Sequence, residues 1–326
     1  MPVRVLLHMM SVPGDAPYDR ASLRLFYPAR DTVDQQVRDS GLYHPRRERA
    51  PLPVLIFLPG VNIPQHSYHW LMEQFVAYGF VVALPEWIAQ NVPGRVSLTP
   101  GIDIEALKQD VFGTRPTASA LAPILDALAQ MNASATLNGL LDLNSIVLGG
   151  HGAGGTLALQ NARPDWCAGV RAAFAYAPNP LAVLALGGWR NGVLPPLPEV
   201  PVMLVGATED GLGDQHNTQY GRPGSAGWET VVAAFDECYD GGREDQYVAV
   251  LEGANHHSIC SPLDDSIGRV FLDKPETQPG DDLRRLIRAC FAGFLKAHMH
   301  GDAAAQGALA GWLRGSDSAL RYGAVK

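Results

Sequence analysis

The sequence predicts an α/β fold with a mostly parallel central sheet and helices on both faces. Three observations carry this prediction. Apolar runs such as 53–58, 80–84 and 201–206 are too short for long helices and too uniformly apolar for half-exposed strands. An amphipathic helix is expected between the first two runs, over 67–78, ended by Gly79. A further apolar run, 145–148, leads through glycines directly into helical spacing.

The stretch that begins with this run, Ser145 to Leu159, is the most informative of the chain. It reads S-I-V-L-G-G-H-G-A-G-G-T-L-A-L, the pattern of a buried strand, a sharp turn and a helix. A phosphate-binding loop would need a lysine after the glycines, which is not present. A dinucleotide fingerprint belongs to the first strand–helix unit, whereas this turn lies mid-chain and Asp165 follows it too closely.

Other elements follow in order along the chain. Strands are expected at 3–12 and 21–29, an exposed loop at 31–50, helices at 102–111 and 116–131, a strand at 170–178, a helix at 228–239, a last strand at 246–251 and a closing helix at 281–298. The tail from 302 to 326 is expected to pack as a final helix. No repeat or linker divides the chain, so we expect one domain over 1–326 with cover loops at about 87–101, 179–200 and 258–280.

Composition restricts the possible partners and compartment. The 326 residues are 47% hydrophobic and 18% charged, with a net charge of −8 and no long basic run, which argues against nucleic acid. No stretch is long and apolar enough to span a membrane, and no signal peptide is evident. Four cysteines without paired spacing indicate reduced thiols, so we expect a cytoplasmic protein. The sequence indicates no oligomeric state.

The glycine-rich turn resembles the nucleophile elbow G-x-S-x-G of the α/β-hydrolase superfamily, with similarity to serine esterases of the dienelactone-hydrolase and chlorophyllase-like kind. Gly150 and Gly154 match the outer glycines and His151 the first variable position. Gly152 stands where the family has its nucleophilic serine. The resemblance covers roughly 53–294 and implies an α/β-hydrolase fold and hydrolysis of a small or lipid-like ester.

The resemblance also implies the remaining site residues. The family's acid follows a strand after the elbow and its histidine follows the last strand, which matches Asp210 and His256. Glu209 and His257 are the fallback acid and base and are expected to face solvent. The backbone N–H groups of Val61 and Ala153 are expected to form the oxyanion hole.

The missing serine leaves the reaction open. Ser258 would have to reach back over its own base, and Cys167 and Cys260 are expected to be inert, so a water molecule is the better attacking group. No cofactor is expected, and no metal either, because His66 and His69 have no nearby carboxylate or thiol. The alternatives to a weakened esterase are a binding or scaffold protein without catalysis, and a lyase or isomerase that uses the His–Asp base without a covalent step.

Overall fold

The computed structural model describes residues 2–92, 94–180, 200–219, 222–239, 243–266 and 268–326. Within this part of the chain, ten strands form one sheet: β1 (Val3–Ser11), β2 (Arg20–Pro28), β3 (Leu52–Leu58), β4 (Val81–Val92), β5 (Arg95–Thr99), β6 (Leu141–His151), β7 (Val170–Tyr176), β8 (Val202–Ala207), β9 (Gln246–Leu251) and β10 (Leu320–Val325). The order is β1-β2-β4-β3-β6-β7-β8-β9-β10, with β5 paired to β4.

The centre of the sheet is parallel and its margins are antiparallel. Strands β4, β3, β6, β7, β8 and β9 run parallel, whereas β1, β2, β5 and β10 pair antiparallel with their neighbours. In a parallel sheet the carboxyl ends of the strands meet at one edge, where ligand sites form. The loops after β3, β6, β8 and β9 therefore share that edge.

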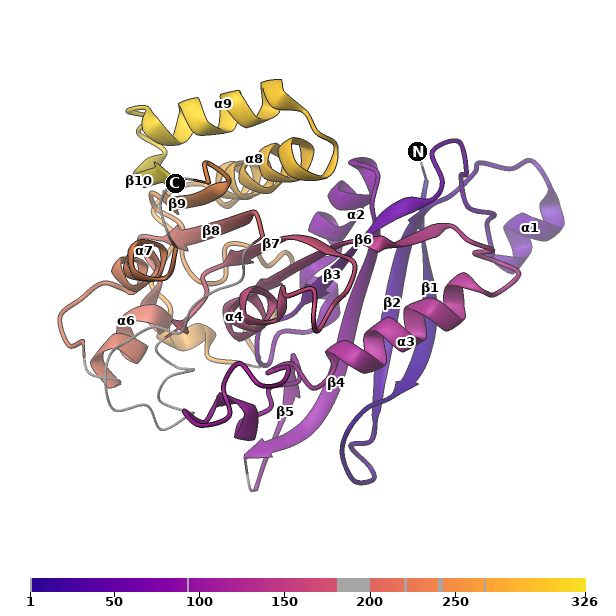
Figure 1. The fold of residues 1–326 in the computed structure, drawn as a ribbon, viewed down its shortest axis with the longest axis horizontal. Helices are drawn as coiled ribbons and strands as arrows, with labels where there is room; N and C mark the ends of the chain where they lie inside the picture. Colours follow the sequence, from indigo (N-terminus) through magenta and orange to yellow (C-terminus); the bar gives the residue numbers. More distant parts are fainter. Residues whose placement is uncertain (1, 93, 181–199, 220–221, 240–242, 267) are drawn as a thin grey trace.

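Helices cover both faces of the sheet, as predicted (Figure 1). The helices are α1 (Gln35–Ser40), α2 (His69–Ala77), α3 (Leu121–Asn132), α4 (Gly152–Asn161), α6 (Gly211–Gln219), α7 (Gly227–Cys238), α8 (Gly280–Met299) and α9 (Ala303–Arg314), with short 3₁₀ turns η1 (Gln65–Tyr68), η2 (Glu105–Leu107) and η3 (Val270–Leu272). Helices α3, α4 and α7 pack on one face, and α2, α8 and α9 pack on the other.

Strand β3 shows why the apolar runs are continuous. Val54, Ile56 and Leu58 belong to the core beneath α3, α4 and α7, whereas Leu55 and Phe57 belong to the core beneath α2 and α8. Because successive side chains point to opposite faces, a strand buried on both sides must be apolar at every position.

The structure corrects the prediction of a cover loop over 87–101. Strand β4 continues to Val92 and the chain returns as β5, so this segment is a β-hairpin. Trp87 and Ala89 are buried while Ile88 between them is exposed, which is the alternation of a half-buried strand. The prediction gave the prolines and glycines of the segment too much weight, since none of them lies within the residues of β4 or β5.

The C-terminal tail is a second correction. It contains α9 and then β10, which pairs with β9, so 246–251 is not the last strand. Three helices also differ from the prediction. Helix α3 begins at Leu121 rather than 116, with Pro123 in its first turn, where no backbone donor is needed. Only η2 forms within 102–111, and α1 forms within the predicted loop at 31–50.

The other two predicted cover loops have different outcomes. Most of 179–200 lies outside the described residues. In the described part of 258–280, η3 is the regular element present. That these segments cover a site, and that 1–326 is a single domain, remain predictions. Among the described residues, no helix has both the length and the apolar character needed to cross a bilayer.

Candidate active site

The turn between β6 and α4 has the shape of a nucleophile elbow. Gly152 follows the last strand residue directly and adopts φ +54°, a left-handed conformation that favours glycine. The flanking glycines are required by close packing. A β-carbon on Gly154 would lie 2.2 Å from the carbonyl oxygen of Leu58, and one on Gly150 would lie 2.6 Å from the backbone of Gly154. The elbow is thus built into the contact between α4 and β3.

Position 152 points at a histidine. A β-carbon on Gly152 would lie 3.1 Å from Nε2 of His256 and 3.4 Å from its Cε1. A side chain at this position would therefore meet the ring nitrogen that can act as a base. The 3.1 Å approach is tighter than most β-carbon contacts, so the imidazole would have to move by a few tenths of an ångström to admit a serine.

His256 is held by the predicted acid. Its Nδ1 lies 3.1 Å from Oδ1 of Asp210, and both side chains are buried. The same oxygen accepts the N–H of Gly213 at 2.7 Å, in the first turn of α6. We call these two side chains the His256–Asp210 pair. The structure brings Gly152, Asp210 and His256 together, although they are far apart in sequence.

Charge and burial act against each other in this pair. Burial lowers the pKa of His256, but the charge of Asp210 and its hydrogen bond outweigh burial and raise that pKa above its ordinary value. Burial raises the pKa of Asp210, but His256 and the Gly213 N–H together hold it below its ordinary value. The arrangement stabilises a protonated imidazole beside a carboxylate, as a general base requires after it has taken a proton.

A second histidine, His151, contacts the backbone oxygen of His256. Gly60 N–H donates to Tyr68 Oη at 2.9 Å, so the tyrosine hydroxyl is free to donate to Nδ1 of His151 at 2.8 Å. The opposite ring nitrogen, Nε2, must then carry the proton that it shares with the backbone oxygen of His256 at 3.0 Å. Burial and the neighbouring histidines lower the pKa of His151 well below its ordinary value, consistent with this neutral form.

The two predicted oxyanion-hole residues lie on adjoining segments. Val61 follows Gly60 at the carboxyl end of β3, and Ala153 is the second residue of α4. Helix α4 packs directly on the carbonyl groups of Leu58 and Pro59, which keeps these segments together. The N–H of a second helical residue has no intrahelical acceptor and lies at the positive end of the helix dipole. The oxyanion role of both residues remains a prediction.

The fallback base was placed wrongly. His257 was expected to face solvent, but its side chain is buried and its Nδ1 lies 2.8 Å from Oδ2 of Asp273. Sequence reasoning missed Asp273, because nothing in the sequence distinguishes it from the other acids of its long loop. Glu209, the fallback acid, is half-buried. Sequence reasoning also missed Tyr68, which lies 83 positions from His151 in the chain.

The other possible nucleophiles are engaged or far away. The Ser258 hydroxyl is buried and bonds to Asn255, accepting its N–H and donating to its side-chain oxygen. Burial raises the pKa of the Cys260 thiol, and the charge of Asp273 raises it further, so no thiolate forms there. Cys167 precedes β7 and so lies at the opposite edge of the sheet, and burial raises its pKa to about 11.

Neither predicted histidine outside the site gathers metal ligands. Nε2 of His69 lies 2.7 Å from the Arg24 guanidinium, and His66 is exposed. In the described part of the chain, no group of three or more His, Cys, Asp or Glu side chains is arranged to hold a metal ion.

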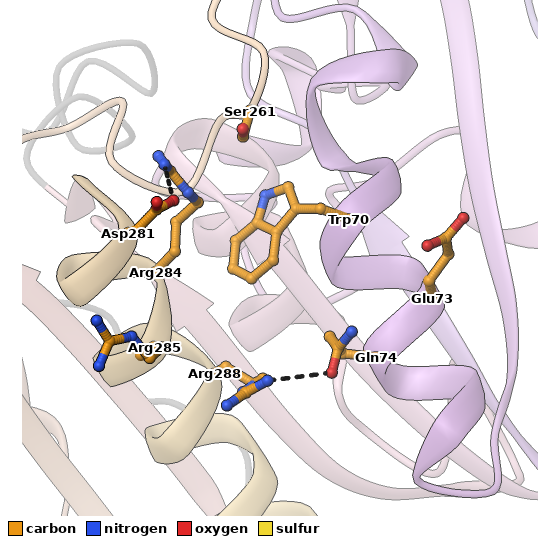
Figure 2. A pocket seen from close by; sticks show the side chains of 8 residues that line it. All are labelled: Trp70, Glu73, Gln74, Ser261, Asp281, Arg284, Arg285 and Arg288. Carbon is orange, nitrogen blue, oxygen red and sulfur yellow. Dashed lines mark hydrogen bonds and ion pairs between the residues drawn. The ribbon is translucent and has the colours of Figure 1, made fainter.

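A pocket of about 520 Å³ lies between α2 and α8 (Figure 2). Trp70 forms one wall, and its indole N–H donates to the backbone oxygen of Ile259 at 2.9 Å. Arg284 pairs with Asp281, and Arg288 lies 3.4 Å from the Gln74 side-chain oxygen. Charges of both signs line this pocket, and none of the predicted site residues is among them.

The fold and the elbow define the class of protein: the chain has an α/β-hydrolase fold. In a comparison with solved structures, a ferulic acid esterase from Streptomyces cinnamoneus aligns with a TM-score of 0.59 and 14% sequence identity, over 99% of this chain and 96% of that chain. No family model matches the chain, and no curated protein matches it in sequence. At this identity the likeness supports the fold alone.

Proposed function

We propose that this protein binds small esters and hydrolyses them slowly, with His256 and Asp210 activating a water molecule and no acyl-enzyme intermediate. The observation that carries the proposal is the buried His256–Asp210 pair, with Nε2 facing the side-chain position of the elbow. An imidazole with one nitrogen fixed by a carboxylate and the other free is a general base.

The proposed hydrolysis needs only the ester and one water molecule. His256 Nε2 takes a proton from water as the water oxygen attacks the ester carbonyl, and Asp210 stabilises the imidazolium that forms. The N–H groups of Val61 and Ala153 stabilise the oxyanion. The C–O bond to the alcohol then breaks, and the imidazolium returns its proton to the leaving oxygen. Gly152 contributes space for the water, because no serine side chain fills it.

Apolar groups near the site support an ester with an apolar part. Val61, Ile88 and Phe271 are exposed by 40%, 52% and 81%. The segments that carry them adjoin one another. Asn62 N–H bonds to the Leu98 oxygen of β5, and a β-carbon on Gly268, in the loop that carries Phe271, would lie 3.3 Å from the Asn62 oxygen.

A binding protein without catalysis is the second candidate. The close approach of His256 to Gly152 favours it, because the imidazole has partly entered the space that a serine would occupy. Such a protein would bind an ester and release it unchanged.

Turnover of p-nitrophenyl acetate tests the proposal. The native protein should show a low rate that falls by about 100-fold in His256→Ala, the usual contribution of a general base. An equally low rate in both proteins would contradict the proposal and support the binding protein. Consumption of an ester without release of acid and alcohol would instead support a lyase or isomerase.

Restoring the nucleophile tests the geometry separately. Gly152→Ser should raise the rate by about 100-fold or more and produce a burst of acyl-enzyme, because the serine would meet His256 Nε2. Gly152→Ala is the matched control, with the β-carbon but no hydroxyl, and should show no burst. A folded Gly152→Ser protein without any gain would contradict the alignment of position 152 with the base.

A further inference from the structure

One buried carboxylate touches both halves of the candidate site. Asp273 follows η3 in the segment between β9 and α8, and its side chain is 3% exposed. Its Oδ1 accepts the N–H of Gly211 at 2.9 Å, and its Oδ2 accepts the N–H of His257 at 3.0 Å and lies 2.8 Å from His257 Nδ1. Oδ1 also accepts the N–H of Lys274 at 3.1 Å.

The positions of these donors in the chain are what matter. Gly211 is the residue directly after Asp210, and His257 is the residue directly after His256. Asp273 therefore joins the loop that carries the acid to the loop that carries the base, each one residue beyond the functional side chain. Gly211 also packs closely against the residue before Asp273, because a β-carbon on Gly211 would lie 2.3 Å from the Leu272 oxygen.

We propose that Asp273 is a positioning residue that sets the separation and orientation of the His256–Asp210 pair by clamping Gly211 and His257. It touches no reacting atom. Its kinetic consequence depends on the proposed function, but the clamp itself does not. The two loops are already joined before the pair, where the Glu209 N–H donates to the Ala254 oxygen at 2.8 Å, and Asp273 joins them again after it. Two connections fix the angle between the loops as well as their distance, and small misplacements of a catalytic group cost large factors in rate.

Electrostatics act in the same direction. Besides Asp210, the charge of Asp273 raises the pKa of His256. Three further histidines lie near the imidazole: His151, His257 and His216 of α6. Burial lowers the pKa of His216 to about 4, and His151 is neutral for the reason given above, so neither supplies charge at neutral pH.

Amide hydrogen exchange in the native protein tests the clamp without any assay of activity. Asp273→Asn keeps the shape but replaces one accepting oxygen with an NH₂ group, so the side chain can accept from only one of the two loops. The amide of Gly211 or that of His257 should then exchange about tenfold faster or more. The amides of β8 should be unchanged. Asp264→Asn is the matched control, because Asp264 is a half-buried acid of the same segment that bonds only to Ser266 among the contacts described.

Titration of the His256 ring by NMR is the second readout. Asp273→Asn should lower the pKa of His256 by about 0.5 unit or more, since a nearby negative charge is lost. His257→Gln keeps that charge and should leave the pKa of His256 within about 0.2 unit of the native protein. If Asp273→Asn does not fold, the same exchange measurement on Asp273→Glu keeps the test: the longer side chain keeps the charge but displaces the accepting oxygens, so the Gly211 amide should exchange faster.

Kinetics complete the test in the Gly152→Ser background. Asp273→Asn should lower kcat by about tenfold and leave KM within about twofold, because the clamp orients the base without contacting substrate. Unchanged exchange at Gly211 and His257 together with an unchanged pKa of His256 would overturn the proposal. If Gly152→Ser gains no esterase activity, the proposed function fails, whereas the exchange and titration results still decide the clamp.

Discussion

Two adjacent histidines, His256 and His257, each pair with a buried carboxylate, and the two pairs have different surroundings. His256 pairs with Asp210 and presents its other nitrogen to position 152. His257 pairs with Asp273, whose oxygens also accept backbone N–H groups. The same chemical pair thus serves once as a candidate base and once as a structural connection. The two roles differ because Nε2 of His256 faces position 152, whereas the oxygens of Asp273 accept backbone N–H groups from two loops.

The largest expected effect is on turnover in the Gly152→Ser background. Asp210→Asn should lower kcat by about 10⁴-fold, because the amide no longer fixes the tautomer that leaves Nε2 free. His257→Gln, the equivalent change in the other pair, should lower kcat by less than about tenfold. Steady-state kinetics on an aryl ester measures both, and equal losses would remove the distinction between the pairs.

The free energy of unfolding should depend more on Asp273 than on Asp210, the reverse of the order for turnover. Asp273→Ala leaves the Gly211 N–H and the His257 ring without their acceptor, while the His257 N–H keeps only the Asn255 side-chain oxygen at 3.0 Å. The change should cost about 3–5 kcal/mol of unfolding free energy. Asp210→Ala removes the acceptor of the His256 ring and of the Gly213 N–H, so its cost should be smaller. Urea denaturation of both variants checks this order, which a larger loss in Asp210→Ala would contradict.

The pH dependence of stability distinguishes His151 from His256. His151 has a pKa lowered in the folded state, so the unfolded chain binds more protons, and stability should fall as pH drops below about 6.5. The slope for one such group is about 1.4 kcal/mol per pH unit. His256 acts with the opposite sign: its raised pKa contributes stability below about 6.5 that is lost as pH rises through the folded value.

His151→Gln separates the two contributions. Glutamine can accept from Tyr68 and donate to the His256 oxygen but does not titrate, so the loss of stability between pH 6.5 and 5 should become smaller. Denaturation midpoints at several pH values measure this. A slope that is the same in both proteins would show that His151 does not remain neutral in the folded protein.

The smallest expected effect concerns the elbow itself. Gly152→Ala should cost about 1–2 kcal/mol, from the left-handed backbone and the close approach to His256. Gly139→Ala is a matched control, because Gly139 has φ +77° but a β-carbon there would meet nothing within 4 Å. The difference between the two variants in thermal denaturation isolates the contact with the imidazole. No difference would mean that His256 moves aside freely.

The sequence predicted the parts of the fold that depend on local pattern. Buried strands, the glycine turn and the amphipathic α8 are written in consecutive residues, and so are the positions of Asp210 and His256 after their strands. The β4–β5 hairpin was missed because its proline and glycine indicated a loop. Asp273 and Tyr68 were missed for another reason: their roles depend on contacts with residues 62 and 83 positions away, which no local pattern encodes.

The form of the elbow has an evolutionary consequence. Its shape is fixed by Gly150, Gly154 and the strand they pack against, not by the residue between them. A glycine codon such as GGU becomes a serine codon, AGU, by one base change. Where Gly152 is encoded by GGU or GGC, a single base change would place a hydroxyl in front of a prepared imidazole, and selection for esterase activity would have a short route to it.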